Sequence, residues 1–495
     1  MKQGFDNEKY LKIQSAHIKE RIAQFGDKLY LEFGGKLFDD FHASRVLPGF
    51  EPDSKLKMLM QLKEDAEIVI VISARDIEKN KVRGDLGITY DVDVLRLRDE
   101  FMKRGLMVSS VVITHYNGQS SASAYRERLE RLGINVYYHY IIEGYPTNVD
   151  LICSDEGFGK NEYVKTSRPL VVITAPGPGS GKMAVCLSQL YQENKRGVKA
   201  GYAKFETFPI WNLPLKHPVN LAYEAATVNL NDVNMIDNYY YDTYGEVAVN
   251  YNRDIEIFPV LRSIFKMING GVCPYNSPTE MGVNMAGYCI DDDEAVCRAA
   301  NDEIIRRYFE TLCDCLNGKL TQKALDKMEL LMKVADLTPN DRPVVQAALD
   351  RSIEENRTPA VAIELKDGQI VTGKTSAFLG PASAALLNAV KKMGGLKRED
   401  KLISRSKIEP IQKLKVDILG NTNPRLHSDE ALIALAVSVS ENPELAPIME
   451  NLSQLRGCEA HSTIILSQVD ADVYRKLGIN LTCEPRYHTK ALFHK

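Results

Sequence analysis

Hydrophobic and polar residues in the first two hundred positions alternate between two patterns. Short continuous runs of Val, Ile and Leu, such as EIVIVIS at 67–73, are typical of strands that are buried on both faces of a sheet. Longer segments between them space their apolar residues as helices do, for example DVDVLRLRDEFMKRG at 91–105. The predicted strands are 28–35, 67–73, 106–114, 134–142, 168–174 and 199–206, and the predicted helices are 7–24, 54–65, 91–105, 122–133 and 184–194. This order predicts a mostly parallel, Rossmann-like or P-loop-like α/β sheet with helices on both faces.

The pattern changes after residue 212 and again near residue 357. Apolar spacing is mostly helical between 213 and 356, where a Gly, Pro and Asn-rich segment at 270–289 is long enough to suggest a functional loop. The last part returns to α/β, with a hairpin at 360–374, a strand at 462–467, a helix at 470–478 and a strand at 479–484. We therefore predict three domains: an α/β phosphate-binding domain at 1–212, a mainly helical domain at 213–356 and a smaller α/β domain at 357–495.

Composition narrows the class of protein. The 495 residues carry 62 Lys and Arg against 66 Asp and Glu, a net charge of −4, so no basic field favours a nucleic-acid partner. The 44% hydrophobic and 26% charged residues are typical of soluble globular proteins and exclude a disordered chain. The first residues contain no apolar segment of the signal-peptide type, and no run of 18 apolar residues predicts a membrane span. Nine scattered cysteines indicate reduced thiols, and we expect a cytoplasmic location.

The strongest chemical signal is LVVITAPGPGSGKMAVCLSQLY at 170–191. A buried strand is followed by a glycine-rich turn and then by a helix, which is the context of a phosphate-binding loop. The glycines allow the backbone amides to approach an anion, the helix start adds its dipole, and the lysine adds a full charge. The predicted phosphate-binding residues are Gly177, Gly179, Ser180, Gly181 and Lys182.

This segment departs from the phosphate-loop pattern G-x-x-x-x-G-K-[ST] at two positions. Pro176 occupies the place of the first glycine, and Met183 replaces the hydroxyl residue that would hold Mg²⁺. ATP or another nucleotide, with or without Mg²⁺, stays a candidate ligand. A second segment, GQIVTGKT at 368–375, matches the pattern fully, but its context predicts a hairpin and not a phosphate-binding loop.

The segment at 204–237 follows the strand that comes after the predicted phosphate-binding helix, so its start belongs at the same sheet edge. Glu206, Asn212, His217, Asn220 and Glu224 are its candidate pocket residues, and Glu206, His217 and Glu224 are the candidate catalytic residues because a carboxylate or an imidazole can act as a general base. The alternative is a solvated connection into the helical domain.

Other loops follow strands of the same predicted sheet and would converge on 174–182 if the sheet is parallel. They contribute Gly34, Gly35, Lys36, Asp39, His42 and Arg45 after the first strand, and Arg75, Arg83 and Asp85 after the second. The C-terminal part offers Arg425, His427, Cys458, Glu459 and His461, for which a polar subunit or ligand contact is a simpler interpretation than zinc. Each of these groups is also compatible with an ordinary solvated loop.

Several long blocks of the sequence resemble one protein family. They are LYLEFGGKLFDDFHASRVLPGFEPD, TAPGPGSGKMAVCLSQLY, YAKFETFPIWNLPLKHPVNLAYEAAT, VNYNRDIEIFPVL and NPRLHSDEALIALA. These blocks resemble the family of uncharacterised bacterial proteins called DUF1846 or UPF0371, over essentially the whole chain. The resemblance implies a cytoplasmic multidomain α/β protein with a helical insert. It supplies no activity and no catalytic residues.

The leading hypothesis is a protein that binds a nucleotide or a phosphorylated metabolite at the sheet edge and carries out phosphoryl transfer or hydrolysis. The alternative is a non-catalytic oligomeric binding or scaffold protein in which the same loop holds a structural anion. NAD-linked redox chemistry is less favoured, because Lys182 stands where the dinucleotide pattern requires its third glycine. We expect a small phosphorylated ligand and a homo-oligomer, and no partner among nucleic acids or membranes.

Overall fold

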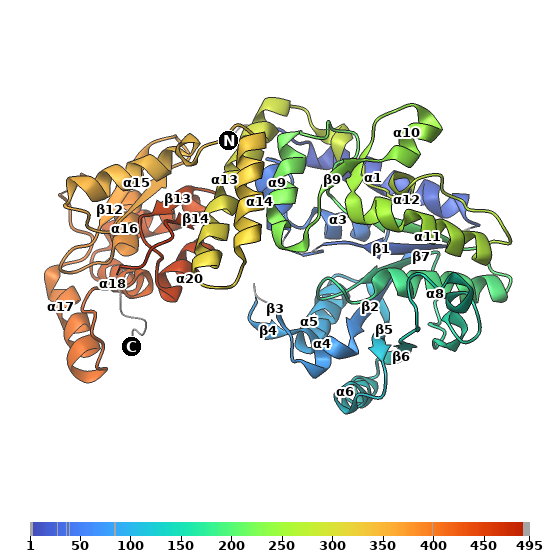
Figure 1. Cartoon of the computed structure of the whole chain (residues 1–495). Coiled ribbons are helices and arrows are strands. Elements are labelled where there is room, and N and C mark those ends of the chain that lie inside the picture. Colours follow the sequence, from blue (N-terminus) through green and yellow to red (C-terminus); the bar gives the residue numbers. More distant parts are fainter. Residues whose placement is uncertain are drawn as a thin grey trace. The chain divides into compact units, whose positions relative to one another are not determined.

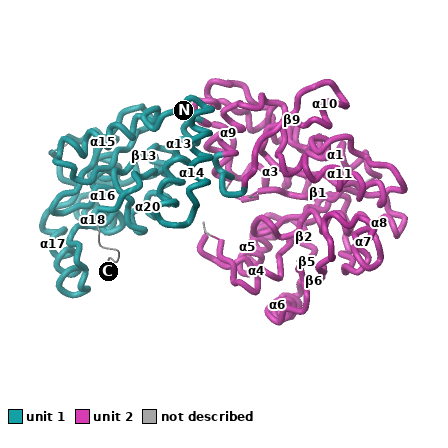
Figure 2. The backbone as a smooth tube through the Cα atoms, in the orientation of Figure 1, with its two compact units in different colours: residues 1, 225–230, 301–495 teal, residues 2–224, 231–300 magenta. Residues whose placement is uncertain are grey.

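The computed structural model describes residues 3–26, 28–35, 37–38, 40–83, 86–397 and 399–488. The chain forms two compact units, drawn in different colours in Figure 2. The N-terminal unit comprises residues 2–224 and 231–300, and the C-terminal unit comprises residues 225–230 and 301–495 together with residue 1.

A six-stranded parallel sheet forms the centre of the N-terminal unit (Figure 1). Its strands are β1 (Leu29–Phe33), β2 (Ala66–Ser73), β5 (Met107–Tyr116), β6 (Asn135–Tyr140), β7 (Leu170–Thr174) and β8 (Gly201–Phe205), in the spatial order β6-β5-β2-β7-β1-β8. Every strand predicted in this half of the sequence is present, and the parallel α/β prediction is confirmed. Short apolar runs, Val- and Ile-rich in β2, β5 and β7, predicted these strands correctly because both faces of the sheet are covered.

Helices pack on both faces of this sheet. Val171 and Ile173 of β7 belong to a hydrophobic cluster that also contains Leu187 of α8 (Lys182–Lys195) and Phe258 of α11 (Asn252–Ile268). Alternate strand residues such as Val172 point to the opposite face, where α5 (Tyr90–Lys103) contacts β2 and β5.

The remaining elements of the N-terminal unit connect or extend this core. They are α1 (Asn7–Gln24), α2 (Phe41–Val46), α3 (Ser54–Gln61), α4 (Ala74–Glu78), β3 (Val82–Arg83), β4 (Ile88–Thr89), α6 (Ser120–Arg131), α7 (Val149–Ile152), β9 (Asn234–Ile236), α10 (Asn238–Tyr244), β10 (Val249–Tyr251) and α12 (Pro278–Met281). Two helices pass from one unit into the other, α9 (Pro218–Ala226) and α13 (Asp293–Leu316).

The C-terminal unit has its own smaller sheet, in the order β12-β11-β13-β14. The strands are β11 (Ala360–Glu364), β12 (Ile370–Lys374), β13 (Glu459–Ser462) and β14 (Asn480–Cys483), and the helices are α14 (Gln322–Val334), α15 (Pro343–Glu354), α16 (Pro381–Met393), α17 (Arg405–Lys413), α18 (Ser428–Glu441), α19 (Ala446–Glu450) and α20 (Gln468–Leu477). The predicted hairpin at 360–374 is confirmed, since β11 and β12 pair antiparallel.

One predicted strand of this sheet is wrong. The apolar segment at 462–467 was expected to form it, but the strand is the more polar segment Glu459–Ser462. Glu459 is acceptable in a buried strand because Arg306 and Arg342 donate to its two carboxylate oxygens, at 2.8 and 2.6 Å. A local hydrophobic pattern cannot reveal partners that lie more than a hundred residues away.

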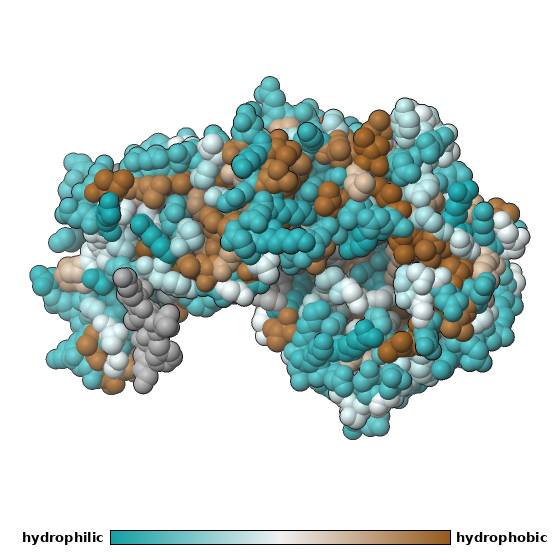
Figure 3. Space-filling view, viewed as in Figure 1, coloured by the Kyte–Doolittle hydropathy of each residue, from teal (hydrophilic) through white to brown (hydrophobic). Residues whose placement is uncertain are grey.

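The surface carries hydrophobic side chains in small groups among hydrophilic ones on the face drawn in Figure 3. Among the helices of the described ranges, none combines the length and the apolar character that crossing a membrane requires.

Candidate functional site

The order of the strands gives the N-terminal sheet a switch point between β2 and β7. From β2 the chain continues to β5 and β6 on one side, whereas from β7 it continues past β1 to β8 on the other. Ligands of open α/β sheets bind where the connections diverge in this way, outside the carboxyl ends of the strands. The glycine loop at 175–181 leaves β7 at this point, beside the segment that leaves β2 at Ser73.

Glycines shape this loop for specific reasons. A Cβ on Gly177 would lie 2.3 Å from the hydroxyl oxygen of Tyr90, so only glycine allows that close approach. Gly181 has φ +89°, a left-handed conformation, and begins α8 without any side-chain cap. The loop therefore ends at a helix start whose amides are not capped by any side chain of the described residues.

The backbone amides of the loop are unpaired. Within the described part of the chain, no hydrogen bond is donated by the N–H groups of Gly177, Gly179, Ser180, Gly181, Lys182, Met183 and Ala184. The hydroxyl of Ser180 is also buried without a partner. Unpaired N–H groups at a helix start create a local positive potential, and a bound anion can accept their hydrogen bonds.

Two cations beside the loop are likewise unpaired. Lys182 is the first residue of α8, and Arg75 lies in α4, directly after β2. Neither side chain forms an ion pair with any residue that the structure describes. The surroundings of the loop therefore carry positive charge that nothing in the described chain neutralises.

Thr114 and His115 at the end of β5 extend the site. The Thr114 hydroxyl donates to the carbonyl oxygen of Ser180 at 2.5 Å, which fixes the loop against β5. The next residue, His115, has φ +51° and places its Nδ1 3.2 Å from the hydroxyls of both Thr114 and Ser73. Burial and the nearby Arg75 lower the pKa of His115, which favours a neutral ring at pH 7.

Thr114 and His115 were not identified as site residues from the sequence. The signal was the THY triplet at the end of a Val-rich strand, since polar residues at the carboxyl end of a parallel strand lie at the ligand edge. A left-handed backbone at a non-glycine residue such as His115 is a further mark of a functional position. Only the coordinates reveal that conformation.

Glu206, one of the predicted catalytic residues, lies directly after β8 in a buried charged cluster. The Lys204 ammonium is 3.1 Å from the Glu206 carboxylate and 2.5 Å from that of Asp254 in α11. Burial raises the pKa of Glu206, and this effect outweighs the lowering by Lys204. A carboxyl group whose pKa is moved toward neutrality suits a general acid or base.

The end of β1 meets the same cluster. A Cβ on Gly34 would lie 2.3 Å from Cγ of Glu206, so the loop after β1 rests against this side chain. Glu32 accepts a hydrogen bond from the Tyr202 hydroxyl at 2.7 Å. Cys186, one turn along α8 from Lys182, is affected electrostatically by both Glu32 and Lys182. The charged cluster and the start of α8 therefore lie on the same face of the sheet.

His217 has a different environment. Its Nδ1 accepts from the backbone N–H of Val219 at 3.3 Å, at the beginning of α9, so the ring proton is on Nε2. Nε2 lies 3.0 Å from the Asp293 carboxylate and 3.6 Å from the Cys297 sulfur. These contacts make His217 a helix cap that donates to Asp293.

His217, Asp293 and Cys297 are also the one group with metal-ligand spacing among the described residues. Zinc prefers such nitrogen and sulfur donors. In this structure Nε2 carries the proton that a metal would have to displace, and burial, followed by Asp293, raises the pKa of Cys297 to about 11. The arrangement fits a hydrogen-bonded polar cluster and does not fit a thiolate ligand or nucleophile.

The other predicted residues have partners of their own. Glu224 accepts from the backbone and the side-chain amide of Asn234, both at 3.3 Å. Asn212 and Asn220 lie on either side of the start of α9, and the Asn220 amide bridges the backbone of Ile210. Glu206, His217 and Glu224 therefore have different partners in different elements.

The candidate residues from the loops after β1 and β2 also lie in separate environments. His42 lies in α2 with its ring centroid 5.3 Å from that of Phe208, and Arg83 donates to the buried Asp93 at 2.9 Å. Gly35 follows β1, where an added Cβ would lie 3.3 Å from the ammonium of Lys55. Arg45 is in α2. Lys36, Asp39 and Asp85, also named as candidates, lie outside the described residues.

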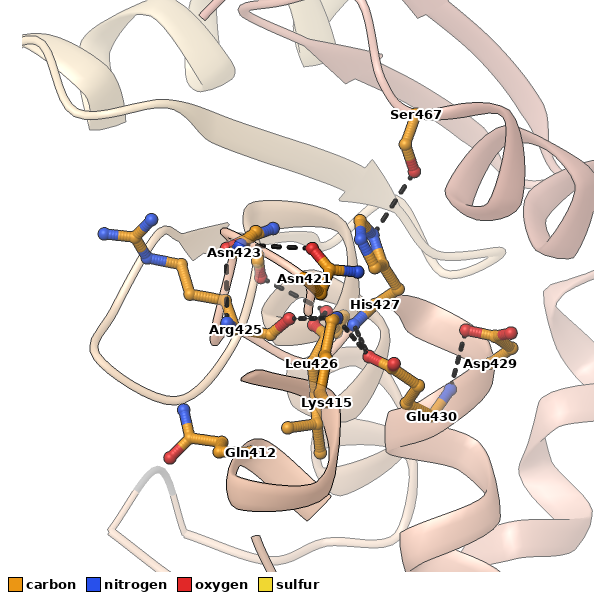
Figure 4. A network of polar contacts seen from close by, with 12 residues as sticks. Gln412, Lys415, Asn421, Asn423, Arg425, Leu426, His427, Asp429, Glu430 and Ser467 are labelled. Carbon is orange, nitrogen blue, oxygen red and sulfur yellow. Dashed lines mark hydrogen bonds and ion pairs between the residues drawn. The ribbon is translucent and has the colours of Figure 1, made fainter. Parts of the chain in front are cut away.

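Arg425 and His427 of the C-terminal unit belong to the network in Figure 4. Lys415 donates to the Glu430 carboxylate and to the carbonyl oxygen of Arg425, both at 2.7 Å. The His427 ring points toward Ser467, whose hydroxyl is 3.3 Å from Nδ1.

The same His427 nitrogen is 2.9 Å from the Asp470 carboxylate. A Ser-His-Asp triad needs the serine and the aspartate on opposite nitrogens of the ring, so this cluster is not such a triad. It joins the starts of α18 and α20, and the hydrogen bond with Asp470 raises the pKa of His427. His461 lies in β13 of the smaller sheet and contacts Thr482 at 2.9 Å, and Cys458 directly precedes that strand.

Fold and site together define a class: an α/β protein with an open parallel sheet, an unsatisfied glycine loop at the switch point and a second, smaller sheet. Comparison with known proteins identifies the family. Residues 3–336 match the domain of unknown function DUF1846, N-terminal, and residues 340–493 match the domain of unknown function DUF1846, C-terminal. The chain belongs to this family.

Relatives in Streptococcus pneumoniae cover the whole length. The UPF0371 protein of strain JJA is 58% identical over 494 residues, which is 100% of both chains. The UPF0371 protein of strain CGSP14 has the same identity and coverage. The predicted resemblance is therefore confirmed for both units of the chain.

Proposed function

We propose that this protein binds the phosphate group of a nucleotide or another phosphorylated metabolite at residues 177–182. One observation carries the proposal: the loop and the first turn of α8 hold a set of unpaired amides around the buried hydroxyl of Ser180. An unpaired buried polar group costs about 1–3 kcal/mol, and a bound anion would remove that cost.

Each part of the site has a distinct task in this proposal. The amides of the loop donate to phosphate oxygens, and the dipole of α8 favours the negative charge. Lys182 and Arg75 neutralise the charge from two sides. His115 supplies a neutral hydrogen-bonding ring next to the loop. The segment after β8, beginning at Glu206, contacts the remainder of the ligand.

Phosphoryl transfer or hydrolysis is the reaction class that we propose for this site, with Glu206 as the general base. Its raised pKa and its position beside Lys204 support that assignment over His217, whose ring already caps α9. Met183 offers no hydroxyl to Mg²⁺, so a metal that arrives with the nucleotide would need carboxylate or water ligands.

Calorimetric titration tests the binding step. The full chain is titrated with ATP, pyrophosphate, inorganic phosphate and glucose 6-phosphate, and the ligand that binds is titrated against Lys182→Ala. We expect affinity to fall about 10- to 100-fold, because a charged hydrogen bond contributes about 1.5–3 kcal/mol. Lys323→Ala is the matched control, since Lys323 is exposed in the first turn of α14.

Turnover separates an enzyme from a binding protein. With the ligand that binds, the release of phosphate is followed for the unaltered chain and for Glu206→Gln, with and without EDTA. Release that Glu206→Gln abolishes while affinity is kept supports catalysis. Binding without any release identifies a non-catalytic anion site, and equal affinity of Lys182→Ala for every ligand contradicts the proposal itself.

A further inference from the structure

A cavity lies at the edge of the parallel sheet opposite the glycine loop, where the strands begin. Its volume is about 350 Å³, within the range of small-molecule sites. The lining residues come from the starts of β2, β5 and β6, from α5 and from the segment before β7, and they include Glu67, Arg98, Lys165 and Ser167. The carboxyl edge that carries the glycine loop is at the other end of the strands.

Glu67 is the unusual residue of this cavity. Its side chain is fully buried, and Oε1 accepts from the backbone N–H groups of Ser167 and Arg168 at 2.5 and 2.6 Å. The second oxygen, Oε2, is buried without a donor from any residue in the described ranges. Buried carboxylate oxygens are normally satisfied, so this oxygen calls for a donor from outside the described chain.

Two cations share the cavity with that carboxylate. Among the described residues, Arg98 donates a hydrogen bond only to its sequence neighbour Asp99, at 3.3 Å and at an exposed position. Lys165 is exposed and forms no ion pair within the described part of the chain. The cavity thus offers one negative and two positive groups, and a complementary ligand has one positive and two negative groups.

We propose that this cavity binds an acidic α-amino acid of the glutamate and aspartate type. The ammonium group donates to Oε2 of Glu67, and the two carboxylates pair with Arg98 and Lys165. The backbone N–H groups of Ser167 and Arg168 hold the Glu67 carboxylate in place from its other oxygen. This site does not depend on the proposed phosphate site, since the two share no residue.

A ligand series tests the charge pattern. The full chain is titrated calorimetrically with L-glutamate and L-aspartate, then with glutarate, which lacks the ammonium, and L-glutamine, which lacks the second carboxylate. We expect L-glutamate to bind, with or without L-aspartate, and both glutarate and L-glutamine to bind at least tenfold more weakly than L-glutamate. If only L-aspartate binds, succinate and L-asparagine take their places in the series, and the same tenfold differences are expected relative to L-aspartate. No heat from L-glutamate or L-aspartate at millimolar concentration would overturn the proposal.

The variant Glu67→Gln tests whether Oε2 of Glu67 accepts a hydrogen bond from the ligand's ammonium group. Its amide oxygen keeps the two backbone hydrogen bonds, while its NH₂ group replaces the acceptor that the ammonium needs. We expect L-glutamate to bind at least tenfold more weakly, and its advantage over glutarate to disappear. Glu64→Gln is the control, because Glu64 is an exposed residue outside the cavity. An unchanged preference for L-glutamate over glutarate in Glu67→Gln contradicts the assignment.

Two further variants complete the test. If Glu67→Gln does not fold, Arg98→Gln on the cavity wall replaces it. We expect Arg98→Gln to bind L-glutamate about tenfold more weakly than the unaltered chain does, with an affinity close to that for L-glutamine. Lys182→Ala is expected to bind L-glutamate as the unaltered chain does. A loss of L-glutamate binding in Lys182→Ala would show that the ligand occupies the glycine loop and would exclude the cavity as its site.

Discussion

Two segments of this chain resemble the phosphate-loop pattern, with a glycine directly before a lysine at the end of the motif, and they fold differently. In GPGSGK at 177–182, the lysine begins helix α8 after a buried parallel strand. In GQIVTGKT at 368–375, Lys374 is the last residue of β12 and pairs with Glu355. The second segment matches the phosphate-loop pattern better and has the geometry of a hairpin.

The difference between these segments lies in their hydrogen bonds. The amides of the first are unpaired and its lysine has no ionic partner within the described residues. In the second, β12 pairs with β11 along its length, and Gly373 packs against the backbone of α16. A phosphate-binding loop is defined by unsatisfied donors at a helix start, and a pattern of letters does not specify them.

The largest expected effect concerns the sheet that contains the hairpin. Glu459 of β13 is held by Arg306 and Arg342, and β13 pairs with β11. Glu459→Gln leaves the buried Arg342 without an anion and leaves Arg306 with Glu303 alone, so we expect the unfolding free energy to fall by about 3–5 kcal/mol. Chemical denaturation of the full chain measures it. Glu450→Gln, at an exposed position, should change stability by less than about 0.5 kcal/mol.

Substituting one glycine in each segment gives the next largest effect. A Cβ on Gly373 would lie 2.1 Å from the backbone nitrogen of Ala385, so we expect Gly373→Ala to destabilise the chain by about 3 kcal/mol. Gly179 has φ +74° and open space around it, so Gly179→Ala should cost only about 1–2 kcal/mol. Differential scanning calorimetry compares the two, and equal losses would contradict the distinction.

Substituting Lys182 and Lys374 compares the two segments by their affinity for the phosphate ligand. Lys374→Ala removes a partly exposed ion pair, and we expect it to lower stability by less than about 1 kcal/mol and to leave affinity for the phosphate ligand unchanged. Titration with the ligand found for the unaltered chain checks this result. Weaker binding by Lys374→Ala than by Lys182→Ala would assign the phosphate site to the hairpin.

A pH dependence of stability is expected from Asp302 of the C-terminal unit. Burial raises the pKa of Asp302 to about 6, above its unfolded value, so the folded state prefers the protonated form. This contribution to stability is present at pH 4 and is lost as the pH rises through 6. Asp302→Asn should therefore come close to the unaltered chain in stability at pH 4 or below and exceed it at pH 8. Thermal unfolding at both pH values provides the measurement, and an equal difference at both would refute the assignment.

Much of the N-terminal fold could be predicted because its signals are local. Short runs rich in apolar and aromatic residues predicted all six strands of the sheet, and the apolar spacing predicted helix 7–24 at the bounds that α1 has. The glycine segment after Thr174 was identifiable because strand, loop and helix follow one another directly.

Other features depend on residues far apart in the sequence. The strand at Glu459 was misplaced because its partners, Arg306 and Arg342, stabilise it from other elements. His115 was overlooked because its left-handed backbone and its contact with Ser73 become visible only in three dimensions. The unpaired oxygen of Glu67 has no signature in the sequence at all.

The sequence by itself determined which segments become strands and helices and where a glycine turn precedes a helix, because backbone geometry and the spacing of apolar side chains act over a few residues. Tertiary structure alone decided the order of the strands and the pairing of the buried charges. It also decided which donors and acceptors are left without a partner. Those properties depend on long-range packing, in which every buried polar group must find a partner from another part of the chain or from a ligand.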